Sequence, residues 1–160
     1  MSGSGDTSTK RCARSKDPDN RQVHCDMHRA SSPLRALTLR QPWAWAVIHA
    51  GKDIENRSWS TSLRGTFAIH AGQGFDGLED LEEIGVRPPR REDLVHGAII
   101  GVVDLVDVVE RHRSRWFNGP TGFVLARPRA LTTPIPCTGA LSFWRVSPEI
   151  ERRIWSQLGR

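Results

Sequence analysis

The chain has 160 residues and a formal net charge of +5, with 38% hydrophobic and 26% charged residues. These values fit one globular domain with its own core, and the lack of a run of about 18 apolar residues excludes a transmembrane helix. The three cysteines are too few and too scattered for a disulfide framework, so we expect a reduced, cytoplasmic protein. The positive charge favours a polyanionic partner, although only mildly.

Residues 1–33 are expected to be a disordered tail, because they mix small, polar and charged residues without a hydrophobic period. The sequence starts without the apolar stretch of a secretory signal. His24, Cys25 and His28 are of zinc-ligand types, but a structural zinc site needs a second close pair, which is missing here. We therefore expect no metal, and nothing in the sequence indicates another cofactor.

A regular hydrophobic pattern begins after this tail and predicts a folded domain over residues 34–160. "LRALTLR" alternates leucine with polar residues and predicts a strand over 34–40. "QPWAWAVIHAG" predicts a short helix over 41–51, because a proline suits its first turn and a glycine its end. "KDIENRSW" and "RGTFAIHAG" predict strands over 52–59 and 64–72, joined by a polar turn.

The strongest strand signal covers residues 97–110, where β-branched residues occupy both alternating faces. That pattern is typical of a strand covered on both sides, as in a closed barrel or beneath a helix.

Ser147 is the expected N-cap of a C-terminal helix. The other expected elements are an acidic helix over 75–85, a proline-broken loop over 86–93, and strands over 121–128 and 139–146. About six short strands with two or three helices at their edges predict an α+β fold built on a small mixed β-barrel.

A dense block of mixed charge, residues 51–59, surrounds the single aliphatic residue Ile54. If Ile54 points into the core, strand alternation sends Glu55 and Arg57 to the opposite face, where they can form an ion pair. The simpler interpretation is a solvated edge strand, which is what charge on a strand usually means.

Lys52 argues for a binding site instead. It is the only lysine of the predicted domain, which has sixteen arginines, so a lone lysine beside a glutamate is consistent with a need for a compact ammonium. The helix before it spans only about 13 Å, so the residues on either side of that helix return to neighbouring places. We expect the following residues to line one depression: Arg40, Gln41, Trp43, Lys52 and Glu55. Cations suit phosphate, the amide and carboxylate suit base edges, and the indole suits stacking, which together predict a site for a nucleotide or nucleic-acid strand.

The stretch "LTLRQPWAWAVIHAGKDIENRSWSTSLRGTFAIHAG" closely resembles the opening of ASCH domains, the activating-signal-cointegrator homology family. The likeness continues through "GAIIGVVDLVDVV", "WFNGPTGFVLARPRAL" and "PIPCTGALSFWRV", and so covers about residues 35–146. It implies a PUA-like β-barrel over 34–160 with a cleft beside the first helix. It also implies binding of RNA or other nucleic acid, since the family is generally taken to do so.

A few small relatives in this family are hydrolases, of which one branch removes the acyl group from N4-acetylcytidine and another is linked to RNA cleavage. Lys52 matches the lysine of the deacylating branch, but Glu55 stands where that branch has its catalytic threonine. A carboxylate cannot replace the hydroxyl in forming the same ester intermediate. We therefore predict a module that binds RNA or single-stranded nucleic acid. The alternative is a hydrolase acting on a modified nucleoside or on RNA through Lys52 and Glu55.

Other residues have two interpretations each. His70 alternates away from the core face and is either a cleft donor or a surface imidazole, and Arg64 either contacts phosphate or caps a turn. The basic run "RHRSRW" is either a solvated loop or a track for a single strand. The residues expected to bind nucleic acid are Arg40, Gln41, Trp43, Lys52, Glu55, Arg57, Arg64, His70, Arg113 and Arg115. A nucleoside-like small molecule is the alternative ligand, and no membrane partner is expected. Cys137 has no base near it in the sequence and is not expected to act as a nucleophile.

Overall fold

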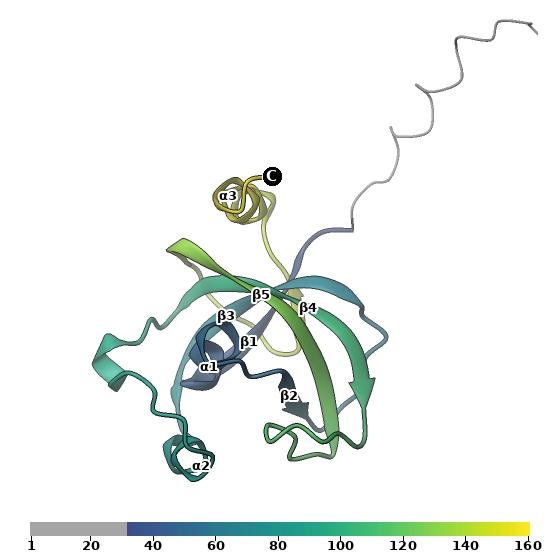
Figure 1. Cartoon of the computed structure of the whole chain (residues 1–160). Coiled ribbons are helices and arrows are strands. Elements are labelled where there is room, and N and C mark those ends of the chain that lie inside the picture. Colours follow the sequence, from purple (N-terminus) through teal and green to yellow (C-terminus); the bar gives the residue numbers. More distant parts are fainter. Residues whose placement is uncertain (1–31) are drawn as a thin grey trace, which may run out of the picture. The chain divides into compact units, whose positions relative to one another are not determined.

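In the computed structural model, residues 32–160 are described, and six strands within them form one mixed sheet accompanied by three α-helices (Figure 1). The predictions for the tail, including its zinc-ligand residue types, lie outside the described residues. The strands are β1 (Arg35–Gln41), β2 (Ile54–Arg57), β3 (Gly65–Phe75), β4 (Ala98–Val109), β5 (Thr121–Pro136) and β6 (Phe143–Arg145). The helices are α1 (Trp43–His49), α2 (Leu78–Glu83) and α3 (Pro148–Gln157), with a 3-10 turn at Arg91–Asp93.

The sheet has the order β2-β5-β4-β3-β1-β6, in which β1 and β3 are parallel and the other neighbours are antiparallel. Three register shifts interrupt the pairing of β4 with β5, and such irregularities bend strands and increase their twist. The two long strands accordingly curve around the domain (Figure 1). The α+β fold with six strands and flanking helices is confirmed. The sheet is not closed, because β2 and β6 stand at its two ends in the described part of the chain.

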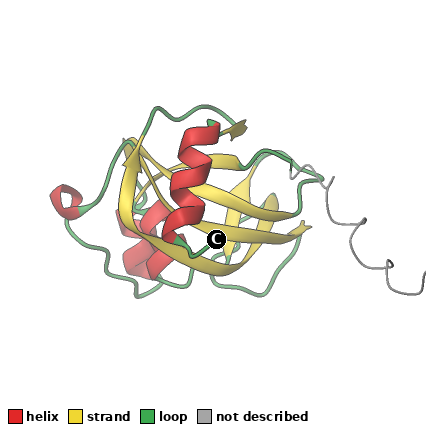
Figure 2. Cartoon of the chain, turned by 90° about the horizontal axis from the view of Figure 1, so that it is seen from above, coloured by secondary structure: helices red, strands yellow, loops and turns green. Residues whose placement is uncertain are grey.

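The double-sided burial predicted for β4 is confirmed, and it separates two core clusters. Every residue from 98 to 105 is buried. Val103 faces a cluster with residues of α1, β1 and β3, and Val102 faces a second cluster that contains Ile154 of α3. Figure 1 shows α1 within the curve of the sheet, and Figure 2 shows α3 lying across the strands. Gly101 permits the close approach of α1, since a β-carbon there would lie 2.7 Å from Cδ1 of Ile48.

Helix ends follow the sequence signals closely. Ser147 caps α3, where its hydroxyl accepts a hydrogen bond from the backbone N–H of Ile150 at 3.3 Å. Gly51 has φ +67° just beyond α1, the left-handed region in which glycine carries no β-carbon penalty. No helix in residues 32–160 has both the length and the apolar character needed to cross a bilayer.

Candidate nucleic-acid interface

A hollow of about 420 Å³ lies beside α1 and β2, and we call it the first hollow. Its wall combines the first residue of α1, the β2 segment, one side of α2 and the loop before β5. The lining residues are Trp43, Lys52, Glu55, Asn56, Asp80, Glu83, Ile84, Arg115, Trp116, Phe117 and Asn118. The depression predicted from the residues around the first helix therefore exists, and three of its five expected members line it.

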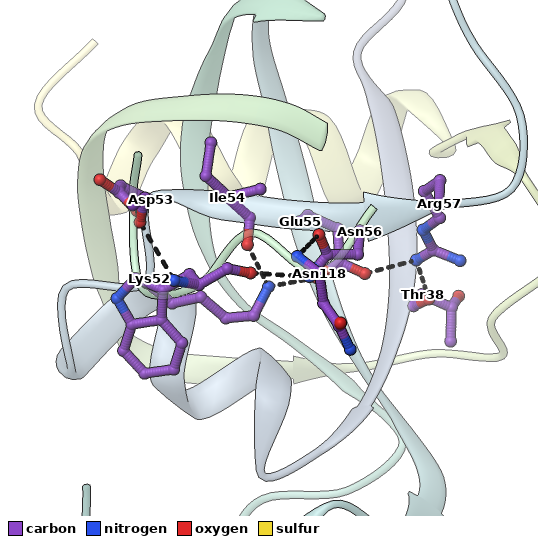
Figure 3. Close-up of polar contacts among 10 residues, drawn as sticks. Thr38, Lys52, Asp53, Ile54, Glu55, Asn56, Arg57 and Asn118 are labelled. Atoms are coloured by element: carbon purple, nitrogen blue, oxygen red, sulfur yellow. Dashed lines mark hydrogen bonds and ion pairs between the residues drawn. The ribbon is translucent and has the colours of Figure 1, made fainter. Parts of the chain in front are cut away.

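Lys52 and Glu55 are the buried charged residues in the lining of the first hollow (Figure 3). Nζ of Lys52 donates to Oε2 of Glu55 at 2.7 Å and also to the carbonyl oxygen of Ile54. The same nitrogen lies 5.7 Å from the centroid of the Trp43 ring, within range of a cation–π contact. An ammonium has three N–H donors, so one remains after these two hydrogen bonds. The ammonium, the carboxylate and the indole thus meet at one place.

Arg57 holds the other oxygen of Glu55. Its Nη2 lies 3.2 Å from Oε1 of Glu55 and donates to the carbonyl oxygen of Thr38 at 3.3 Å (Figure 3). The ion pair predicted from strand alternation is therefore present. The solvated-strand interpretation is wrong for the two central charges, because Lys52 is 4% and Glu55 8% exposed. Burial of both groups is tolerated because each charge has an opposite charge and a hydrogen bond.

Asn56 attaches β2 to the loop that forms the facing wall. Its Nδ2 donates to the carbonyl oxygen of Trp116 at 2.8 Å, and its Oδ1 accepts from the backbone N–H of Asn118 at 2.9 Å. Trp116 itself is buried, whereas the side chain of Asn118 is exposed at the hollow. Sequence reasoning missed Asn56, Phe117 and Asn118, and the turn residues "NGP" after the basic run were the available signal.

The helix α2 contributes Asp80 and Glu83, two exposed carboxylates that sequence reasoning also missed. The helix begins against the indole, because Gly77 at its N-terminus has φ +76° and a β-carbon there would lie 2.2 Å from Cζ2 of Trp43. This contact fixes the edge of the Trp43 ring. The acidic residues of the helix, which the sequence indicated only as an acidic segment, are thereby placed on the rim.

A second hollow, of about 390 Å³, adjoins the first. Its lining residues are Thr38, Leu39, Arg40, Trp43, Glu55, Arg57, Ala140, Leu141 and Ser142. Trp43 and Glu55 line both hollows and so stand between them. Arg40, expected beside Lys52, lines this second hollow and forms an exposed ion pair with Asp76, which lines neither hollow.

Two of the predicted residues are used inside the fold. Gln41 is 1% exposed, and its amide donates to the carbonyl oxygen of Val95 at 2.7 Å and accepts from the backbone N–H of Trp45 at 3.0 Å. His70 is 2% exposed, with Nε2 3.0 Å from the carbonyl oxygen of Cys137. Neither side chain lines either hollow, so the base-reading amide and the cleft imidazole are not found there.

The remaining predicted arginines are exposed. Arg115 lines the first hollow, stacks its guanidinium 5.2 Å from the Trp116 ring centroid, and donates to the backbone. Arg64 pairs with Asp107 at 3.3 Å, outside both hollows. Arg113 is likewise exposed and lines neither hollow. Among the three, Arg115 is the one that the tertiary structure brings to the wall.

Two titratable groups away from the hollows have shifted pKa values. Burial by itself would raise the pKa of Asp104, but hydrogen bonds from Thr66 and Arg127 and the charges of Arg127 and Arg129 outweigh it and lower the pKa. Burial raises the pKa of the Cys137 thiol, and a backbone hydrogen bond at Ile99 only partly offsets this. A raised pKa leaves less thiolate, in keeping with the prediction that Cys137 is not a nucleophile.

The sequence matches the model of the ASCH domain over residues 37–132. Because this match covers more than half of the chain, the chain belongs to the ASCH domain family. The matched region contains α1, β2, β3, α2, β4 and the charged segment 51–59, whereas β6 and α3 lie beyond it.

Two relatives and one solved structure are similar to this chain. Activating signal cointegrator 1 of Homo sapiens and that of Mus musculus are each 24% identical in an alignment 132 residues long that covers 72% of this chain. The same alignment covers 23% of each relative, so this chain spans about a quarter of their length. A crystal structure of ASCH from Zymomonas mobilis is 16% identical, with a TM-score of 0.48, and covers 78% of this chain and 94% of that one.

Proposed function

We propose that this domain binds RNA or another single-stranded nucleic acid and that the first hollow receives one of its bases. The observation that supports this most is the meeting of Trp43, Lys52 and Glu55 in one hollow of about 420 Å³. Membership of the ASCH domain family agrees with association with nucleic acid.

The lining of the first hollow suits a base better than a phosphate. Trp43 and Phe117 offer aromatic faces on which a base can stack. The unused donor of Lys52 and the exposed amide of Asn118 can pair with acceptors on a base edge, while Asp80 and Glu83 accept from its exocyclic amines. Such contacts read unpaired bases, since a paired base hides these edges in a duplex.

Hydrolysis of a modified nucleoside or of RNA by Lys52 and Glu55 is the second candidate, and the buried ion pair in the hollow is what favours it. Two features weigh against catalysis. Glu55 stands where a hydroxyl nucleophile is expected from the deacylating relatives. Both of its oxygens also accept contacts from cations, so a water molecule would have to compete with Lys52 or Arg57. We therefore favour binding over catalysis.

The binding proposal is tested by fluorescence anisotropy with a labelled single-stranded RNA and the DNA of the same sequence at low salt. We expect saturable binding that weakens steeply as salt is added, because phosphate contacts release counterions.

The Asn118→Ala variant tests whether the first hollow is the binding site, because it removes an exposed side chain from the lining and leaves the core intact. We expect it to weaken binding about fivefold, whereas Arg153→Ala on α3 serves as the control and stays near the unmodified protein. No binding of either strand at low salt would end the proposal.

Catalysis is tested separately by incubating the protein with N4-acetylcytidine and with a mixed-sequence RNA. Product that forms with the unmodified protein and disappears in Glu55→Gln would favour the hydrolase over the binding module. Substrates that remain unchanged over hours, with a protein that still binds RNA, would leave binding as the function of the hollow.

A further inference from the structure

We propose that the second hollow is a phosphate subsite that continues the path of the strand, with Leu141 as a contact surface for the next base. This inference rests on the proposed function of the first hollow. It adds the path that the strand takes after its base is bound. The strand leaves the first hollow past Trp43 and Glu55, which line both hollows, and continues into the second.

The two hollows differ in the sign of their charge. The first is lined by two cations, Lys52 and Arg115, against three carboxylates, Glu55, Asp80 and Glu83. A phosphate placed there would meet like charge on the rim. The base and not the phosphate therefore belongs in the first hollow.

The second hollow has the opposite balance. It is lined by Arg40 and Arg57 against the single carboxylate of Glu55, which already faces Lys52 as well as Arg57. A strand with its base in the first hollow thus finds net positive charge directly beyond Trp43. An arginine pair in this position favours phosphate binding, because one guanidinium can donate two parallel hydrogen bonds to the oxygens of a phosphate.

Arg57 is held in place with donors left open. Its Nη2 is occupied by the carbonyl oxygen of Thr38 and by Glu55, which fixes the plane of the guanidinium. Its Nε is buried and has no hydrogen-bond partner among residues 32–160. Because Nε is buried, a phosphate in the second hollow would meet the guanidinium through Nη1, which has no hydrogen-bond partner among residues 32–160 and is not one of the buried polar atoms. Arg57 is therefore preorganised for an anion.

Arg40 is the adjustable partner. Its side chain is 69% exposed, and the Asp76 carboxylate with which it pairs is 46% exposed. Exposed ion pairs of this kind contribute little to stability, so Arg40 can leave Asp76 for a phosphate at a small free-energy cost. The second hollow thereby combines one guanidinium held by Thr38 and Glu55 with one that is exposed and free to change partner.

Leu141 is 93% exposed on the rim of the second hollow. The loop that carries it is tightly packed at its base, because a β-carbon at Gly139 would lie 2.6 Å from the ring of His70 and from Oγ1 of Thr38. Ser142, which follows Leu141, has φ +55°. A fully exposed aliphatic side chain on a well-packed turn, beside two arginines, resembles the apolar wedges with which proteins contact and separate neighbouring bases.

The subsite is tested with a ladder of competitors in the anisotropy assay: a nucleoside, its 3′- and 5′-monophosphates, and a trinucleotide of the same base. The variants are Arg40→Gln and Leu141→Ser. Their matched controls are Arg90→Gln, another exposed ion-paired arginine, and Val106→Ser, another exposed aliphatic residue, neither of which lines either hollow. All four positions are exposed, so the fold of each variant should be retained.

We expect both test variants to bind the nucleoside within twofold of the unmodified protein. Arg40→Gln should weaken one monophosphate and the trinucleotide about fivefold and reduce the salt slope by about one. Leu141→Ser should weaken only the trinucleotide, about fivefold. If both variants bind every competitor like their controls while Asn118→Ala still loses affinity, the second subsite is wrong and the first hollow stands. If the unmodified protein binds none of the competitors and no RNA, both proposals fail together.

Discussion

Two carboxylates on strands of this domain are buried beside an arginine, and only one of them lies at a hollow. Glu55 on β2 contacts Lys52 at 2.7 Å and Arg57 at 3.2 Å. Asp104 on β4 contacts Arg127 at 2.7 Å and accepts a hydrogen bond from Thr66. By their direct contacts alone the two clusters are similar, because each carboxylate forms an ion pair with an arginine.

Their surroundings differ. The side chain of Lys52 is 3% exposed, so Glu55 replaces the water that would otherwise solvate its ammonium, whereas the side chain of Arg127 is 70% exposed and remains largely hydrated. The cluster around Glu55 is also bordered by Trp43 and by the loop that Asn56 holds in place, which together leave a concave space. A charged cluster on a strand therefore becomes a candidate site only where neighbouring elements enclose space beside it.

The largest expected effect comes from removing the cation of each cluster. Lys52→Ala should lower the free energy of unfolding by about 3 kcal/mol, because it leaves the Glu55 charge buried with only one cation beside it. Arg127→Ala should lower it by about 1 kcal/mol or less, because that guanidinium is mostly in water. Urea unfolding followed by tryptophan fluorescence measures both. Equal losses in the two variants would show that the two clusters do not differ as described.

A smaller effect is expected when the indole is displaced without any change of charge. Gly77→Ala should lower stability by about 2 kcal/mol and weaken RNA binding, since the new methyl group overlaps the Trp43 ring. Gly85→Ala is the matched control at the other end of α2, with φ +75° against +76° but with no atom within 4 Å of the added carbon. Backbone strain is therefore similar in the two variants, and their difference in affinity and stability reports the contact with Trp43. Identical behaviour of the two would contradict the role given to the indole.

The Asp104 cluster predicts a pH dependence with a definite sign. The pKa of Asp104 is lower in the folded protein than the ordinary value. The contribution of its carboxylate to the free energy of unfolding is therefore complete above about pH 4 and is lost as the pH falls through the folded pKa. Asp104→Asn removes this contribution. The stability difference between the unmodified protein and Asp104→Asn, from urea unfolding at pH 6 and about pH 3, should therefore shrink at the lower pH. A difference that stays constant would refute the lowered pKa.

The smallest effect concerns Cys137, which shows what burial does without an opposite charge. Because burial raises the pKa of its thiol, alkylation by iodoacetamide at pH 8 should be slower in the folded protein than in urea. The rate is followed by mass spectrometry of the peptide that contains Cys137, which separates it from the two cysteines of the tail. Equal rates in both states would contradict the effect of burial.

Local sequence signals predicted most of the fold. The alternating and double-sided apolar patterns located β1 and β4, and Ser147 located the start of α3, because such signals depend on residues within one turn or one strand. The length of β5, which extends to Pro136, was underestimated, since its second half is defined by pairing with β4 and not by its own pattern.

The amino-acid sequence by itself determined the charged part of the site: Lys52 and Glu55 are three residues apart, and Arg57 follows on the same strand, so local geometry brings them together. Tertiary structure alone decided what encloses them. Asn56 reaches Trp116 across sixty residues, and α2 places its carboxylates on the rim. It also decided that Gln41 and His70 are buried in the fold. The physical reason is that a concave surface needs walls from elements distant in the chain, and no local pattern specifies how such elements pack.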